Sequence, residues 1–259
     1  MPGLRFALLG SGSRGNATLI ECGGTRILVD CGFSIRETET RLGRLDVEAR
    51  ALDAILVTHE HGDHLRGVGP LARRHGIALW MTPGTRAAVP QRMAATMPEV
   101  TLFDPHTSFA IGDLLIQPVP VPHDAREPCQ FVFSDGARRL GVLSDAGHIT
   151  PHMRACLDGV DALALECNHD EAMLAEGPYP PMLKARVGGN LGHLSNAQSA
   201  GLLDGMDCSR LQHLVLTHLS EHNNTPDHAR AAVVDALRCP VDWPGVAHQE
   251  HGHEWRGIQ

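Results

Sequence analysis

The chain has 259 residues, of which 42% are hydrophobic and 20% are charged; this length suits one large α/β domain, and the composition excludes wholesale disorder and the fibrous classes. The formal net charge of −8 excludes a broad basic surface that grips nucleic acid through many phosphates, so a phosphate-containing substrate has to be held locally. No apolar run reaches the roughly 20 residues of a membrane span and the N-terminus lacks the features of a secretory signal, so we expect a cytoplasmic protein without a membrane partner.

Short strands and helices follow one another along the chain. Hydrophobic alternation and turn residues predict strands at Leu4–Gly10, Ala17–Cys22, Arg26–Asp30, Ala54–Thr58, Ala78–Met81, Leu114–Val119, Gln130–Ser134, Leu140–Ser144, Ala162–Glu166 and His213–Thr217. Helices are predicted from an N-cap at Ser34 to about Leu42, and at Leu65–His75, Thr85–Ala95, Asn196–Met206 and Asp227–Leu237. Hairpins followed by alternating strands and helices predict two sheets with helices outside. We expect a single domain over residues 1–245, followed by a polar, His-rich C-terminal tail over 246–259 that is a disordered end or an adventitious metal binder.

The cysteines do not indicate a metal site, whereas the histidines do. The seven cysteines are odd in number, scattered and never spaced as CxxC, which argues against a disulfide framework or a thiolate zinc site. The 17 histidines outnumber the Phe, Trp and Tyr residues together, and several gather near acidic residues in short segments. Histidine clustering of this kind indicates metal chemistry.

The segment Thr58-His59-Glu60-His61-Gly62-Asp63-His64 follows the predicted strand Ala54–Thr58 directly. His59 and His61 are two residues apart, so in an extended segment both rings face one side, while Asp63 and His64 reach another. One short loop therefore supplies ligands for two metal ions. The competing interpretation, a hydrated loop that happens to be rich in His and Asp, is much weaker.

Three further residues follow apolar strands and complete such a site. His123 lies in VPVPHDA, Asp145 in GVLSDAG and His218 in HLVLTHLS. Taken alone, a histidine at a strand end is a solvated or hydrogen-bonded residue. The shared position after apolar strands favours convergence at one sheet edge, where sites in α/β folds are usually built. His123 then completes the ligands of the first metal ion, Asp145 bridges both ions, and His218 completes the ligands of the second.

The series HEHGDH, PHD, SDAG and THLS resembles the motif series of the metallo-β-lactamase fold. This resemblance implies an αββα sandwich over nearly the whole chain with a two-metal site at the sheet edge. It assigns His59, His61, His123 and Asp145 to one metal, and Asp63, His64, Asp145 and His218 to the other. Because the ligands are nitrogen and oxygen without thiolate, the two divalent ions are zinc, manganese or iron.

Other segments are similar to the phosphodiesterase branch, which includes tRNase Z and the YycJ-type exonucleases. They are the opening LGSGSRGN, Glu166-Cys167-Asn168-His169-Asp170, Tyr179-Pro180, Gly192-His193-Leu194-Ser195-Asn196 and Asn223-Asn224. In tRNase Z an acid and histidine pair lies beside the metals, which implies that Glu166 orients His193 as the proton donor to the leaving oxygen. The alternative is a structural His193 in a segment where Ser195 caps a helix.

Substrate contacts are expected from several polar side chains. The Gly-rich opening turns the backbone so that successive N–H groups meet an anionic oxygen, with Ser13 and Asn16 adding donors. Lys184 and Arg186 would neutralise phosphate oxygens, although each alone is equally well a solvated surface charge. The resemblance adds His169 and Asn223 to this set.

These observations predict a dinuclear metal-dependent phosphodiesterase, in which Asp63 positions the attacking water and Glu166 and His193 assist. The YycJ-type resemblance implies a 5′-to-3′ exonuclease on single-stranded DNA, with a nucleic acid or another phosphodiester as its partner. The alternative enzyme is a small-molecule hydrolase, acting on cyclic phosphates, thioesters or lactones. A non-catalytic binding module on a decayed hydrolase fold is a third hypothesis, which the complete ligand series argues against.

Overall fold

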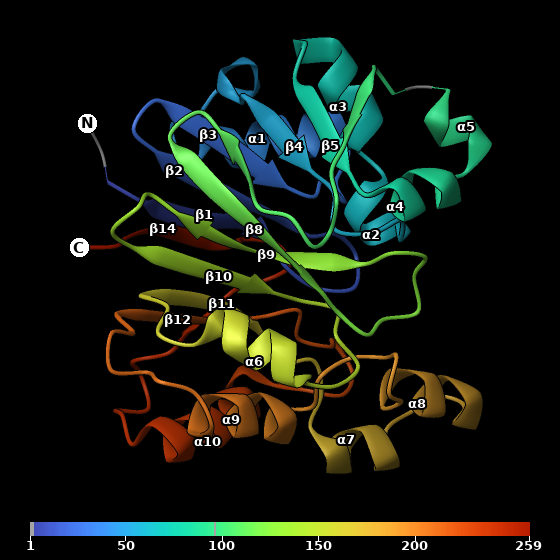
Figure 1. The fold of residues 1–259 in the computed structure, drawn as a ribbon. Coiled ribbons are helices and arrows are strands. Elements are labelled where there is room, and N and C mark those ends of the chain that lie inside the picture. The colour runs from blue at the N-terminus through green and yellow to red at the C-terminus, as the bar shows by residue number, and fades with distance from the viewer. Residues whose placement is uncertain (1–2, 96) are drawn as a thin grey trace.

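The computed structural model describes residues 3–95 and 97–259, and its strands form two sheets that pack face to face between outer helices (Figure 1). The first sheet has the strand order β14 (His253–Gly257), β1 (Arg5–Gly10), β2 (Ala17–Cys22), β3 (Thr25–Val29), β4 (Ala54–Leu56), β5 (Ala78–Met81) and β6 (Val100–Leu102). The second has the order β13 (Gly245–Val246), β12 (His213–Thr217), β11 (Ala162–Glu166), β10 (Arg139–Leu143), β9 (Cys129–Ser134), β8 (Leu114–Pro120) and β7 (Phe109–Ile111). The αββα sandwich predicted from the sequence is confirmed.

Helices cover the outer face of each sheet. The first half contributes α1 (Ile35–Gly43), the 3-10 turn Ala49–Ala51, α2 (Gly62–Leu65), α3 (Val68–His75), α4 (Pro83–Ala88) and α5 (Gln91–Ala94). The second half contributes α6 (Pro151–Leu157), α7 (Glu171–Glu176), α8 (Pro181–Val187), α9 (Asn196–Asp204) and α10 (Pro226–Leu237). The predicted start of α1 is confirmed, because the Ser34 hydroxyl accepts a hydrogen bond from the Glu37 N–H in a capping box.

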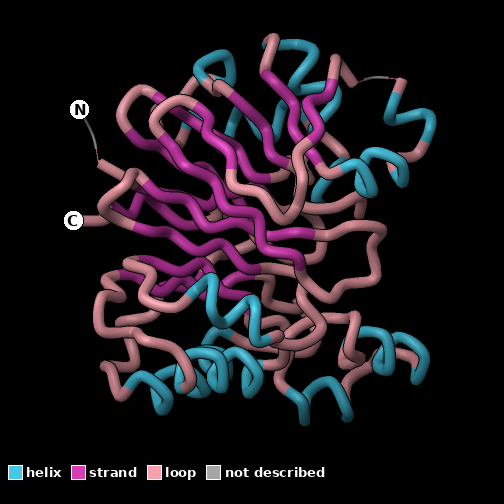
Figure 2. The backbone as a smooth tube through the Cα atoms, in the orientation of Figure 1, coloured by secondary structure: helices cyan, strands magenta, loops and turns pink. Residues whose placement is uncertain are grey.

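Buried apolar side chains form three layers in this fold. Figure 2 shows the backbone of the two stacked sheets and the helices outside them. Phe6, Phe131 and Phe133 are fully buried between the two sheets. A second layer packs α1 and α3 on the first sheet, and a third packs α6, α9 and α10 on the other.

No helix among the described residues is long and apolar enough to cross a membrane. The cysteines are free thiols, and burial raises the pKa of Cys31 to about 11 and that of Cys167 to about 12, so both stay protonated.

Parallel pairing brings the carboxyl ends of several strands to one edge. Strands β3, β4, β5 and β6 pair in parallel in the first sheet, and β10, β11, β12 and β13 do so in the second. Three residues just after these strands have left-handed backbones: Asp30 with φ 61°, Asp145 with φ 51° and His218 with φ 54°. This conformation is strained for a residue other than glycine, so its recurrence at one edge points to a functional site there.

Some elements differ from the sequence-based prediction. A single helix was predicted over Thr85–Ala95, but the chain forms α4 and α5, because Pro90 lacks an N–H and disfavours a helical residue before it. The short strands β6 and β7 were not predicted. They have only three residues each, which is too short for a hydrophobic period to be recognised.

The C-terminal segment is part of the first sheet, so the prediction of a disordered end over 246–259 was wrong. Strand β14 pairs antiparallel with β1, and Arg5 stacks its guanidinium 4.1 Å from the ring centre of Trp255. The Trp255 indole N–H also donates to the carbonyl of Leu45. The polar and histidine residues of this segment did not predict a strand, because β14 is an edge strand whose side chains are half or fully exposed.

We expect the Gly252→Ala substitution to lower the free energy of unfolding by about 1–2 kcal/mol. Gly252 has φ 65°, and a Cβ there would lie 1.8 Å from the Leu8 carbonyl oxygen. Gly257→Ala is the matched control, since Gly257 lies in β14 and a Cβ added to it would have nothing within 4 Å. Thermal denaturation of the two variants tests this. Equal melting temperatures would contradict the docking of this segment on β1.

Candidate metal centre

The seven residues predicted as metal ligands lie together at the edge where the parallel strands end. Within the described part of the chain, they form overlapping groups whose ligand atoms lie within 4.8 Å of one another. They come from four separate segments: His59, His61, Asp63 and His64 after β4 and in α2, His123 after β8, Asp145 after β10, and His218 after β12. Side chains far apart in sequence therefore form one continuous cluster.

The first group contains His59, His61 and His123. His123 Nε2 lies 3.2 Å from His61 Nδ1, and the ring of His59 lies 4.6 Å from that of His61 between centroids. His59 Nε2 is buried and has no hydrogen-bond partner. A buried imidazole nitrogen without a partner is costly unless it binds an ion, so this group fits a metal.

The second group contains Asp63, His64 and His218, and Asp145 adjoins both groups. His64 Nε2 lies 3.4 Å from a carboxylate oxygen of Asp63 and 3.2 Å from one of Asp145. His218 Nε2 lies 3.7 Å from Asp63 and is likewise buried without a hydrogen-bond partner. Asp145 also forms a group with His59 and His64. The position of this carboxylate between the two groups fits a bridging ligand.

Asp30 was missed by the sequence-based prediction, although it ends a predicted strand. Its carboxylate is buried, accepts the Thr58 hydroxyl at 2.7 Å and lies 2.8 Å from His64 Nδ1. The Thr58 oxygen, having donated its proton to Asp30, accepts from His59 Nδ1 at 2.9 Å. One buried carboxylate therefore fixes the tautomers of His59 and His64, with both Nε2 atoms facing the cluster.

The remaining ligand histidines are oriented in the same way. His123 Nδ1 donates to the Gly192 carbonyl at 2.9 Å, and His61 Nε2 donates to the Asp124 carbonyl at 3.2 Å. His218 Nδ1 donates to Glu166 at 3.0 Å. Since carbonyl and carboxylate oxygens only accept hydrogen bonds, each assignment leaves the other ring nitrogen available to a metal.

The electrostatics of the cluster favour a cation. Burial works to raise the pKa of Asp63, but the neighbouring imidazoles of His64 and His218 hold it far below its usual range. Burial works to lower the pKa of His218, yet Asp145, Asp63 and Glu166 raise it to about 10. Burial lowers the pKa of His59 well below its ordinary value. The buried carboxylates thus favour positive charge in the cluster, which a proton on His218 or a bound divalent cation would supply.

Glu166 and His193 lie next to this cluster, as the sequence predicted. The Glu166 carboxylate is fully buried, and its Oε1 accepts from His193 Nδ1 at 2.8 Å. Its Oε2 accepts the backbone N–H groups of Ala146 and Leu194. Burial opposes ionisation of Glu166, but the positive charge of His193 and the hydrogen bonds from His193 and His218 lower its pKa to about 2. The carboxylate is therefore ionised and holds His193 with its Nε2 free.

The Gly-rich loop differs from the expectation in one respect. Several of its N–H groups already have protein acceptors: Gly12 donates to the Asn16 side chain, Arg14 to the Gln249 side chain and Asn16 to the Asp63 carbonyl. The Asn16 amide lies 3.3 Å from an Asp63 carboxylate oxygen. The loop is therefore a support for Asp63 that the C-terminal segment completes, and it does not offer a row of N–H groups to an anion. Ser13 is exposed and lines the cavity beside the cluster.

Three residues predicted to bind substrate lie elsewhere. Asn223 is fully buried, and its side chain donates to Ser220. His169 is buried and lines a different cavity together with Lys184, whose ammonium group donates to the Ala175 carbonyl. These three side chains do not line the cavity beside the predicted metal ligands, and their contacts with a substrate stay predictions.

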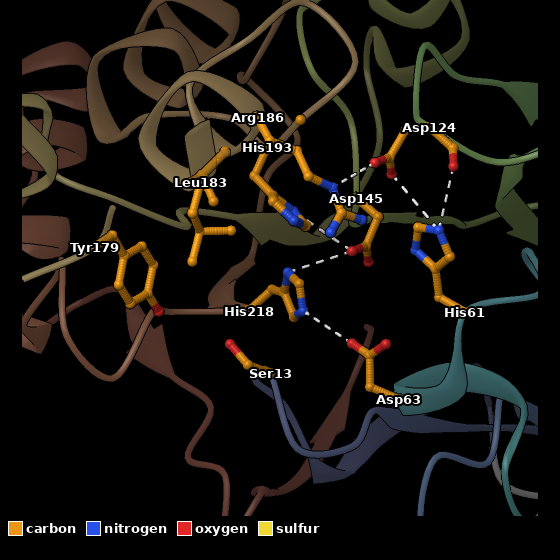
Figure 3. Close-up of a pocket in the computed structure, with 12 residues that line it drawn as sticks. Ser13, His61, Asp63, Asp124, Asp145, Tyr179, Leu183, Arg186, His193 and His218 are labelled. Atoms are coloured by element: carbon orange, nitrogen blue, oxygen red, sulfur yellow. Dashed lines mark hydrogen bonds and ion pairs between the residues drawn. The ribbon is translucent and has the colours of Figure 1, made fainter. Parts of the chain in front are cut away.

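Arg186 does reach the cavity, and it does so through a residue that the sequence-based prediction omitted. Its Nε donates to Asp124 at 2.6 Å, and the other Asp124 oxygen lies 3.6 Å from His61 Nε2. The signal was available, since Asp124 directly follows the predicted ligand His123. Figure 3 shows Asp124 and His61 on one side of the cavity and Tyr179 and Leu183 on the other, with Asp145 and His218 between them. The cavity has a volume of about 230 Å³.

Comparison with known proteins agrees with this geometry. Residues 25–219 match the family model of the β-lactamase superfamily domain. The chain is 32% identical to the exodeoxyribonuclease YycJ of Bacillus anthracis over 96% of this chain and 95% of that protein. It is 32% identical to the exodeoxyribonuclease WalJ of Streptococcus pneumoniae over 91% of this chain and 88% of that protein. Among solved structures, the metallo-β-lactamase fold protein YhfI of Bacillus subtilis superposes with a TM-score of 0.75 at 18% identity, covering 99% of each chain.

We expect Asp30→Asn to weaken binding of divalent metal by about 10–100-fold, because a neutral amide no longer fixes His64 and Thr58. Asp46→Asn is the matched control: Asp46 has the same left-handed backbone, with φ 57°, but is exposed and belongs to none of the ligand groups. Competition with a chromogenic chelator for Zn²⁺ and Mn²⁺, with circular dichroism to verify folding, measures the difference. Equal affinities in folded wild type and Asp30→Asn would refute the positioning role.

Proposed function

The chain belongs to the β-lactamase superfamily, in the branch that includes the YycJ and WalJ relatives, and we propose that it is a dinuclear-metal-dependent 5′-to-3′ exonuclease on single-stranded DNA. Membership in this branch makes it a metal-dependent hydrolase. The observation that carries the proposal is the meeting of seven nitrogen and oxygen ligands with ring nitrogens left bare, in a chain similar to two exodeoxyribonucleases over nearly its whole length.

The donor set supports two divalent ions. His59, His61 and His123 form one group, Asp63, His64 and His218 form the other, and Asp145 adjoins both. Nitrogen and oxygen donors without thiolate suit zinc, manganese or iron. When bound, a pair of divalent ions polarises a phosphodiester and lowers the pKa of a water molecule.

His193 is the proton donor in this proposal. It is 21% exposed and lines the cavity, whereas the Glu166 that holds its Nδ1 is fully buried. This leaves Nε2 as the atom able to transfer a proton to the leaving oxygen, and the ionised carboxylate stabilises the imidazolium that precedes the transfer. Asp63 orients the attacking water, and the cluster's buried walls restrict access of bulk water.

Arg186 and Ser13 supply the phosphate contacts. Asp124 holds the Arg186 guanidinium by one nitrogen, which leaves its other N–H groups for phosphate oxygens. The chain carries a net charge of −8, so attraction of a DNA strand comes from the metal ions and Arg186 at the cavity. A locally held phosphate is consistent with an exonuclease that contacts few nucleotides at once.

We expect the purified protein with Mn²⁺ or Zn²⁺ to release nucleotides from the 5′ end of a single-stranded oligonucleotide. Oligonucleotides labelled at either end, and others with phosphorothioate linkages at either end, reveal the polarity in a digestion series with Mn²⁺, Zn²⁺, Mg²⁺ and chelator. Asp145→Ala removes a ligand shared by both groups and abolishes cleavage, whereas Asp204→Ala, at an exposed aspartate of α9, is the control.

Two outcomes of this series would overturn parts of the proposal. Degradation blocked by 3′ rather than 5′ phosphorothioates would reverse the polarity. Hydrolysis of a thioester or a cyclic phosphate without any cleavage of DNA would replace the nuclease with a small-molecule hydrolase.

We expect His193→Gln to lower kcat on DNA by about 10²–10⁴-fold while metal content stays unchanged. The same variant loses far less activity on bis-p-nitrophenyl phosphate, because p-nitrophenolate leaves without protonation. His152→Gln, at an exposed histidine of α6, is the control. An equal loss on both substrates would argue against proton donation by His193.

A further inference from the structure

The cavity beside the metal ligands has one apolar wall that the proposed chemistry does not use. His61 and Asp124 lie on one side of it and Tyr179 and Leu183 on the other, with Asp145 and His218 between them (Figure 3). Val187 also lines the cavity. Phosphate chemistry needs charge and hydrogen bonds, so an aromatic ring and two aliphatic side chains lining the same cavity require another explanation.

Helix geometry explains why two of these side chains share a face. Leu183 and Val187 are four residues apart in α8, and Tyr179 lies in the turn just before the helix begins and lines the same cavity. The Tyr179 ring also meets the ring of His222 edge to face, with centroids 5.8 Å apart. All three wall residues are half-buried, and Tyr179 is the only tyrosine of the chain. The wall is therefore a fixed surface whose aromatic ring is supported by a second ring.

We propose that Tyr179, Leu183 and Val187 form a subsite for one unpaired nucleobase, next to the phosphate that is cleaved. This inference rests on the proposed function and names the part of the substrate that the cavity recognises. Aromatic and aliphatic side chains stack on bases of any identity, because every base has an apolar π face. Arg186 lies on the same helix and lines the same cavity, so base and phosphate are bound side by side.

The size of the cavity limits what enters. Its volume of about 230 Å³ is below the roughly 300–1,000 Å³ of sites for drug-sized ligands. In this proposal the cavity takes one base with its sugar and not a base pair. A nucleotide must therefore be unpaired before its phosphate reaches the metal ligands, which accounts for a requirement for single-stranded ends without any recognition of sequence.

The test compares single-stranded oligonucleotides that differ only in one base. The natural oligonucleotide is compared with two others, in which an abasic tetrahydrofuran residue replaces the first or the second nucleotide at the 5′ end. For the wild type, we expect kcat/KM on the natural strand to exceed kcat/KM on one of the two abasic strands by about 10–100-fold, which is the range expected for one stacked base.

Variants show whether the wall causes this preference. Tyr179→Ala brings the ratio close to one, Tyr179→Phe retains it, and Leu183→Ala reduces it in part. Met182→Ala is the matched control, since Met182 belongs to α8 but is 87% exposed and does not line the cavity. A wild type that cleaves natural and abasic strands equally, or a Tyr179→Ala variant that keeps the full ratio, would refute the subsite.

Binding separates this inference from the proposed function. Dissociation constants of the same oligonucleotides are measured by fluorescence anisotropy in the presence of chelator, where no cleavage occurs. If the wild type fails to cleave DNA with any metal but binds the natural strand more tightly than an abasic one, the exonuclease proposal fails and the base subsite stands. If the two strands bind and react alike, the subsite fails while exonuclease activity is unaffected.

Discussion

The arrangement of the metal ligands depends on the hydrogen bond that each ligand histidine donates with one of its ring nitrogens. Burying imidazoles among carboxylates is unfavourable unless every ring has a fixed acceptor. Asp30, acting directly on His64 and through Thr58 on His59, holds two of them, and Glu166 holds His218 together with His193. The other ring nitrogens then lie close together, and a bound divalent cation would satisfy them.

The fold supplies the acceptors because strands from both sheets end at the same edge. Asp30 follows β3, Glu166 ends β11, and the ligands Asp145 and His218 follow β10 and β12. The left-handed backbone at Asp30, Asp145 and His218 turns the chain sharply, so the side chains point along the edge instead of into the sheets. At Gly32 a Cβ would lie 1.7 Å from the Asp63 carbonyl oxygen, which shows how closely the loop after β3 packs on the ligand loop.

The two sides of the cavity differ in charge and shape, so in the proposed reaction each side contacts a different part of the substrate. Asp145, His193 and His218 line the cavity at the predicted metal site, and α8 provides an apolar surface together with Arg186. In the proposed reaction the first group faces the phosphate. A chain with a net charge of −8 cannot attract DNA over its whole surface. Placing the favourable contacts in one small cavity reconciles an acidic protein with an anionic polymer.

Local signals in the sequence indicated two sheets with outer helices and the set of histidines and aspartates that come together. The resemblance to the metallo-β-lactamase fold and to tRNase Z added the αββα order and the pairing of Glu166 with His193. A strand followed by HEHGDH, and apolar strands followed by His123, Asp145 and His218, are patterns of residue type and spacing. Tertiary structure decided what spacing cannot encode: the acceptor for each ring, the direction of loop side chains and the pairing of an edge strand. Asp30 and Asp124 were overlooked, and β14 was taken for a tail, since each depends on contacts between segments distant in the chain. For the same reason, only the structure showed that His169, Lys184 and Asn223 do not line the cavity beside the predicted ligands.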